Sequence, residues 1–232
     1  MRHPLKAFYE FLDRPLFGAG RILLALLVIP LVLSFSAPLW RIELHAPQYP
    51  NGLTLDIYAH TVEGGNHGQH LTEINTLNHY IGMHKIDRGE LSDLDWIPFA
   101  LGAIALLTLR CAAIGKVRDL VDIVVVVGYV TAFAFGRYAY KMYVFGHNLN
   151  PDAPVKVPPF TPPLLGSKQI ANFTSTSLPQ LGTLFVGAFA TGAALLLVWH
   201  LFAGRRAAVR AEAATTAAQA AWASPSAGTR TT

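Results

Sequence analysis

The sequence predicts an all-α membrane protein with four transmembrane helices and a small extracytoplasmic α+β cap. Of its 232 residues, 52% are hydrophobic and only 14% are charged, whereas a soluble domain carries about a quarter charged residues. Four apolar stretches each approach the roughly 20 residues that cross a bilayer. Two long polar segments separate these stretches and contain no spanning run.

The predicted spans are residues 22–40, 96–114, 120–140 and 181–203. The first runs from Ile22 to Trp40 without a charge, and Pro30 is expected to kink or break it. A cleaved signal peptide ending near Ser36 is the alternative. A retained anchor is favoured, because the leading segment 1–21 is long and contains acidic residues.

The polar segment 41–95 is predicted to form the cap. Apolar and polar residues alternate over 42–44 and again over 53–57, which is the period of a strand with one buried face. Pro50-Asn51-Gly52 supplies turn chemistry, so a hairpin is expected there. A short helix is expected from Thr72 to about Gly82, where apolar residues recur at helical spacing.

The second polar segment, 141–180, is rich in proline, which interrupts both helices and sheet ladders. It is therefore predicted to be an extended, stiff strap. The Ala- and Thr-rich end, 204–232, is predicted to be a disordered tail or a frayed helix.

Basic residues set the predicted orientation. Eleven of the 18 Lys and Arg lie in 1–21, around Lys116 and in the tail, close to the spans. The positive-inside rule then places both termini in the cytoplasm of a bacterial inner-membrane protein, with both polar segments on the periplasmic side. Seven of the nine histidines fall on that side.

The stretch 72–84 carries the candidate metal site. In a helix, Asn75, His79 and Met83 stand four residues apart and share one face. Imidazole and thioether together suit copper, above all Cu(I). The predicted ligands are His79, Met83, His84 and His147, with Met142 as a further candidate and with Glu73 and Asn75 orienting them. In the alternative, His79 and Met83 only pack the helix against its surroundings.

Other chemistry has weaker support in the sequence. His60, His67 and His70 lie in a glycine-rich segment, which we interpret as a solvated loop with at most weak metal binding. No intrinsic haem is expected, because only His200 lies within a predicted span. No catalytic motif stands out, and no enzymatic activity or nucleic-acid partner is expected.

Two stretches, Leu77–Met83 (LNHYIGM) and Pro158–Gly166 (PPFTPPLLG), resemble a family of uncharacterised bacterial four-span membrane proteins. Its members accompany genes for copper enzymes and respiration, including nitrous oxide reductase maturation. The resemblance implies an accessory role near periplasmic copper and assigns no residue a role.

The function predicted from the sequence is thus that of a non-enzymatic membrane accessory protein. It would act at the periplasmic face, in copper handling or in assembling a periplasmic respiratory copper enzyme, with a protein partner on that side. The alternative is a structural or electron-transfer subunit of a respiratory complex, with the strap as its docking surface.

Overall fold

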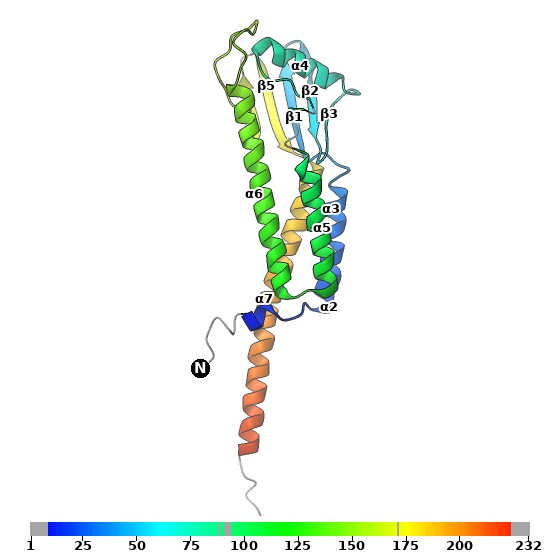
Figure 1. Ribbon diagram of the computed structural model, residues 1–232, viewed down its shortest axis with the longest axis vertical. Coiled ribbons are helices and arrows are strands. Elements are labelled where there is room, and N and C mark those ends of the chain that lie inside the picture. Colours follow the sequence, from blue (N-terminus) through cyan, green and yellow to red (C-terminus); the bar gives the residue numbers. More distant parts are fainter. Residues whose placement is uncertain (1–8, 88, 91–93, 171, 224–232) are drawn as a thin grey trace, which may run out of the picture.

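The computed structural model describes residues 9–87, 89–90, 94–170 and 172–223. A sheet with one helix on it forms one end of the elongated molecule, a helical bundle forms its middle, and the last helix continues alone past the bundle toward the other end (Figure 1). The helices are α2 (Gly18–Leu26), α3 (Val28–Leu33), α4 (Gln69–Ile81), α5 (Trp96–Ile114), α6 (Val117–His147) and α7 (Leu181–Ala223). The strands are β1 (Trp40–Ala46), β2 (Tyr49–Ile57), β3 (Val62–Gly64), β4 (Gly166–Ile170) and β5 (Phe173–Pro179).

The prediction of an all-α protein with four transmembrane helices is wrong. The cap is built on a five-stranded antiparallel sheet with the order β3-β2-β1-β5-β4. In the described part of the chain, three helices are long and apolar enough to cross a membrane: α5, α6 and the Leu181–Gly204 part of α7.

The predicted span 22–40 is replaced by a shorter apolar stretch, Gly18–Leu33, which is divided into α2 and α3. Pro30 explains the division, because its ring conflicts with the carbonyl four residues earlier, at Leu26, where α2 ends. Proline is tolerated in the first turn of the next helix, and α3 begins at Val28. The chain then enters the sheet at Trp40, so the end of the predicted span is strand.

The bundle has a buried apolar centre and an apolar exterior. Leu24, Leu120 and Phe189 are fully buried in its core. Large apolar side chains also point outward, and Leu106 and Tyr129 are 70% and 75% exposed. Helices that are apolar all round are typical of membrane spans.

The predicted hairpin is present as β1 and β2, with Ile42 opposite Leu55 and Leu44 opposite Leu53. Its turn lies earlier than expected, because Ala46 pairs with Tyr49. The Pro50-Asn51-Gly52 segment instead forms an irregularity within β2, where Gly52 has a φ of +76°.

Residues of the predicted strap complete the cap. Residues 148–165, which we call the extended segment, form no helix or strand; they turn at 151–152 and run on without a turn or bend from 156 to 163. The chain then forms the hairpin β4–β5, with β5 beside β1. The extended segment 148–165 also closes the end of α4: the Val155 amide donates to the Tyr80 carbonyl (3.0 Å) and the Asn150 amide to that of Gly82 (2.8 Å). These contacts hold the segment against the cap.

Helix α6 is longer than the hydrocarbon of a bilayer is thick. Its 31 residues correspond to about 46 Å, against roughly 30 Å of hydrocarbon in a bilayer. The 19 residues of α5 correspond to about 28 Å, which matches that thickness. The last turns of α6 therefore stand beside the sheet (Figure 1).

Candidate functional site

The structure separates the two central residues of the predicted copper site. Helix α4 ends at Ile81, and Gly82 takes a left-handed conformation with a φ of +78°. Met83 therefore lies outside the helix and not on the face that carries Asn75 and His79. The His79 side chain is exposed and its ring lies near Tyr80, with centroids 6.4 Å apart.

The other two predicted ligands have separate partners. The Nε2 atom of His84 is 3.1 Å from the Asn148 amide nitrogen, and its Nδ1 is 3.8 Å from the Glu90 carboxylate. His147 is exposed and stacks on Tyr143, with ring centroids 3.9 Å apart.

Glu73 and Asn75, predicted to orient the metal ligands, contact other parts of the cap. The Tyr49 hydroxyl donates to Glu73 (2.5 Å), and this bond raises the pKa of Tyr49 above its usual value. Asn75 holds the backbone of Ile86 by two hydrogen bonds of 2.9 and 2.7 Å. Among the described residues, no three His, Cys, Asp or Glu side chains form a group that could hold a metal ion. Copper binding stays a prediction.

The histidine-rich loop has one histidine with a structural role. The Nδ1 atom of His70 accepts a hydrogen bond from the Thr54 amide at 3.0 Å, which ties the start of α4 to β2. Asn66 and His67 both have positive φ, so the loop turns tightly before α4.

A cavity of about 820 Å³ lies between the cap and the outer part of the bundle, and we call it the interfacial cavity. One wall is the sheet face that carries Ile42, Leu44 and Leu55. The C-terminal half of α4 and the extended segment 148–165 close other sides, and α5, α6 and α7 supply the remaining wall. This volume lies within the range of small-molecule sites, roughly 300–1,000 Å³.

Helix α6 contributes a continuous stripe to the cavity. Val130, Ala134, Tyr138, Lys141 and Phe145 recur at intervals of three or four residues and all line it. Such spacing places them on one face of the helix. Helix α6 therefore forms a wall of the cavity that runs from the bundle up into the cap (Figure 1).

A buried polar cluster joins the sheet to α6 at this wall. Ser177 on β5 is fully buried, and its hydroxyl lies 2.7 Å from the Trp40 indole nitrogen and 2.8 Å from the Tyr138 hydroxyl. It also donates to the Leu164 carbonyl at 3.3 Å. One small side chain thus connects two strands, α6 and the extended segment.

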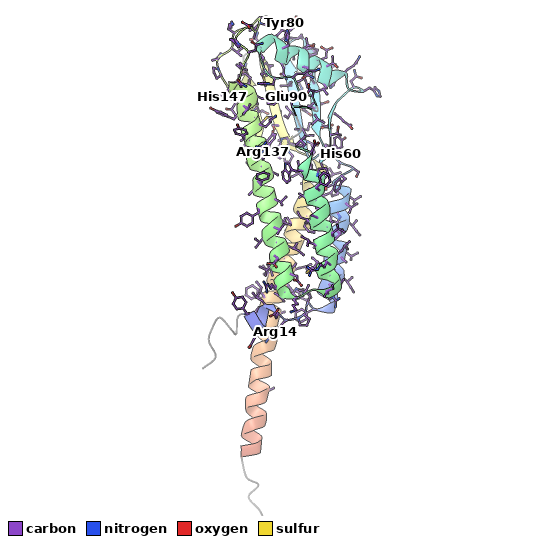
Figure 2. The ribbon with its side chains drawn as sticks, viewed as in Figure 1. Arg14, His60, Tyr80, Glu90, Arg137 and His147 are labelled. Carbon is purple, nitrogen blue, oxygen red and sulfur yellow. The ribbon has the colours of Figure 1, made fainter. Side chains whose placement is uncertain are left out.

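The lining is almost wholly apolar, with two cations and no described carboxylate. The cations are Arg137 and Lys141, one turn apart on α6. The Lys141 ammonium lies 3.7 Å from Glu90, which stands outside the cavity lining, and 5.5 Å from the centre of the Phe145 ring. Figure 2 shows Arg137 near the level at which the sheet meets the helices, and Glu90 farther from the bundle along the long axis of the molecule.

The cavity reaches the molecular surface at the level of the bundle. Thr131 and Phe135 on α6 line it and are also exposed, Phe135 by 51%. They follow Val117 by 14 and 18 residues, which is about 21 and 27 Å along the helix. If α6 enters the bilayer at Val117, this opening faces the hydrocarbon in the half of the membrane nearest the cap.

No protein-family model, curated protein or solved structure matches this chain. The family resemblance drawn from the two motifs therefore stays a prediction. Both motifs contribute to the interfacial cavity, through Leu77, Ile81 and Met83 in one and through Phe160 and Pro162 in the other.

Arg137 and Lys141 are not among the functional residues predicted from the sequence. The signal was present, since two basic residues four apart follow a long apolar run and share a helical face with Ala134 and Phe145. Ionisable residues at such positions are candidates for function.

Proposed function

We propose that this protein binds a membrane lipid in the interfacial cavity and holds the part of the lipid that has left the bilayer, a lipid chain, inside the cap. The observation that carries the proposal is an apolar cavity of about 820 Å³ that begins between the helices and continues between α4 and the sheet. Three helices are long and apolar enough to span a bilayer, which supports a position of this cavity next to lipid.

The position of the cavity favours an amphiphile over a soluble apolar molecule. Its lower part is lined by residues such as Thr131 and Ala134, at the level of the hydrocarbon, and its upper part by strand residues such as Ile42 and Leu44. The upper part stands outside the membrane, and water there would contact mostly apolar side chains, which is unfavourable. A lipid chain entering from the bilayer removes that contact.

The lining offers different surfaces to the apolar and polar parts of a lipid. The apolar walls provide a surface for acyl chains, and the polar side chains gather where α6 leaves the level of the hydrocarbon, at Arg137, Tyr138 and Lys141. A ligand pocket commonly combines an apolar lining with a few polar groups that orient the ligand. The arrangement supports binding and presentation of a lipid, and it suggests no bond-making step.

The test is to fill the cavity with a side chain. Ala134→Trp places an indole in the space that Ala134 lines, whereas Ala132→Trp places the same group on an exposed position of α6 outside the lining. Native mass spectrometry of the purified chain should show retained lipid on the wild type and on Ala132→Trp, and little on Ala134→Trp. Both variants should keep the wild-type circular dichroism spectrum. Equal retention by the two variants would refute the proposal.

A further inference from the structure

A stripe of exposed residues runs along α6, and we call it the α6 stripe. Its members are Val126, Tyr129, Phe133, Gly136, Tyr140, Tyr143 and His147. They follow one another at alternating steps of three and four residues, all are exposed, and none lines the interfacial cavity. This spacing is that of the a and d positions of a heptad repeat, which form a continuous seam on one side of a helix. Such a seam is suited to packing against a second helix with the same repeat.

Tyr129 favours contact of this face with protein over contact with lipid alone. It follows Val117 by 12 residues, which is about 18 Å along α6. With Val117 at one boundary, Tyr129 therefore lies well inside the roughly 30 Å of hydrocarbon. Its side chain is 75% exposed, and its hydroxyl makes no hydrogen bond to the residues that the structure describes. A hydroxyl without a partner is unfavourable in hydrocarbon, and polar side chains there commonly bond to a neighbouring helix.

The other end of the α6 stripe lies beyond the membrane. Tyr143 and His147 follow Val117 by 26 and 30 residues, or about 39 and 45 Å. The hydrocarbon and one layer of head groups together end roughly 35–38 Å from Val117. An aromatic belt at the head groups accounts for Tyr140, but not for Tyr129 below it or for the stacked rings of Tyr143 and His147 above it. The partner that covers the whole stripe must be a helix that crosses the hydrocarbon and continues past it.

A second copy of this chain meets that requirement. Two copies in one membrane have the same orientation and depth, so a two-fold axis along the membrane normal brings each member of the stripe opposite itself. The partner helix is then also α6, whose 31 residues extend past the hydrocarbon by the same length. At Gly136, in the middle of the stripe, no described atom lies within 4 Å of the position that a Cβ would take. The two backbones can therefore approach closely there.

The area of the α6 stripe is sufficient for a dimer. Its four large aromatic side chains, Tyr129, Phe133, Tyr140 and Tyr143, are 52–75% exposed. Each carries about 150–250 Å² of surface, so together they expose about 500 Å² per copy and about 1,000 Å² in two copies. A specific interface buries roughly 1,000 Å² or more.

The stripe has a definite end on the side away from the cap. Asp122 would continue the spacing one turn before Val126, and it is exposed. Two facing carboxylates repel each other, most strongly where water is scarce. The contact between two copies therefore begins at Val126 and runs toward the cap.

We infer that two copies of the chain pair through the α6 stripe, with their α6 helices parallel around a two-fold axis. The two Tyr129 hydroxyls meet at this axis, where one donates a hydrogen bond to the other. The residues of α6 that line the interfacial cavity are not members of the stripe, so pairing leaves the lining of each cavity uncovered. The inference does not depend on lipid binding.

The test places charges on the stripe outside the hydrocarbon, at Tyr143. Full-length copies labelled at the C-terminus with a donor or an acceptor dye are mixed in phosphatidylcholine vesicles, and energy transfer is followed as lipid is added. Tyr143→Glu and Tyr143→Lys each set two like charges against each other, so each should weaken the dimer about tenfold or more. A mixture of donor-labelled Tyr143→Glu and acceptor-labelled Tyr143→Lys should restore it, because the facing charges are then opposite.

Matched variants separate the stripe from other surfaces. Leu165→Glu adds a charge at a 65% exposed apolar residue of the extended segment and should leave energy transfer unchanged. Ala134→Trp changes the cavity lining and should also leave it unchanged. In a chain with Cys111→Ala, Tyr143→Cys should form a disulfide-linked dimer under mild oxidation, whereas Leu165→Cys should not.

The results that would overturn the inference are definite. Wild-type energy transfer no greater than that expected for randomly distributed copies would exclude the dimer and leave the lipid-binding proposal unaffected. A Tyr143→Glu dimer as stable as the wild type would place the contact elsewhere. Loss of energy transfer in both single variants without recovery in their mixture would show that the two Tyr143 side chains do not face each other, and would equally overturn the inference.

Discussion

Replacing Ser177 by alanine should loosen the junction between the sheet and α6. In the structure the Ser177 hydroxyl donates to the Leu164 carbonyl, so it serves as acceptor for the Trp40 indole and the Tyr138 hydroxyl. Alanine fills nearly the same space and removes all three hydrogen bonds. The substitution therefore tests the polar contacts with little change in packing.

The expected loss follows from the donors left without an acceptor. A buried donor without a partner costs about 1–3 kcal/mol. Trp40 and Tyr138 would both lose their acceptor, but Tyr138 lines the cavity, so a water or a ligand atom can partly replace the serine. We expect a loss of about 2–3 kcal/mol in the free energy of unfolding, or about 4–12 °C in Tm for a chain of this size.

The assay is thermal unfolding followed by circular dichroism, with Ser167→Ala as the matched control. Ser167 also lies in the sheet and shares a hydrogen bond with Thr176 at 2.8 Å, but this pair is exposed. Surface substitutions of this kind change stability by less than about 0.5 kcal/mol. A Ser177→Ala Tm no lower than that of Ser167→Ala would show that the Ser177 hydroxyl does not hold the junction together.

Three further predictions use other parts of the cap. Gly82→Ala should destabilise the protein by about 1–3 kcal/mol more than Gly68→Ala. Both glycines have positive φ, but a Cβ at Gly82 would lie 2.8 Å from the Asn150 carbonyl oxygen, whereas a Cβ at Gly68 would meet no atom within 4 Å. Equal losses of Tm would contradict this prediction. The Glu73 carboxylate raises the pKa of Tyr49 in the folded protein. As pH rises from about 10 through this raised pKa, the wild type should therefore lose more folding stability than Glu73→Gln. Parallel profiles of stability against pH would exclude this coupling. If copper is bound, Met83→Leu should weaken Cu(I) binding about tenfold or more in a competition titration, and unchanged affinity would exclude Met83 as a ligand.

The sequence predicts well the parts whose signal is local. Helix α5 occupies residues 96–114, the bounds of a predicted span, because a largely apolar run there, with Arg110 as its one charged residue, is followed by Gly115. The alternation over 42–44 and 53–57 identifies β1 and β2. The alternation does not locate the turn between these strands. Gly52 does take a positive φ, but it does so at an irregularity within β2 and not at the end of the hairpin.

The rest depends on contacts between distant segments. Strand β5 reads Phe-Thr-Ser-Thr-Ser, so its inward positions, Ser175 and Ser177, are small and polar and give no apolar period. Its pairing with β1, more than 120 residues earlier, makes it a strand. The helix-face argument for His79 and Met83 fails because Gly82 ends α4 between them. The cavity itself combines walls from the sheet, from the segment 148–165 and from helices α4, α5, α6 and α7, which no local pattern describes.

The most direct test of lipid binding is photocrosslinking in the membrane. Vesicles containing the full chain and a phosphatidylglycerol with a diazirine in its acyl chain are irradiated, and the labelled residues are located by peptide mass spectrometry. Bulk lipid can label outward side chains of the bundle such as Leu106 and Leu195, but it cannot reach a sheet that stands outside the hydrocarbon. Lipid binding in the cavity predicts additional labels on Ile42, Leu44 or Leu55, and predicts that Ala134→Trp abolishes them while Ala132→Trp does not. Labels confined to the outward faces of the helices in the wild type would contradict the account.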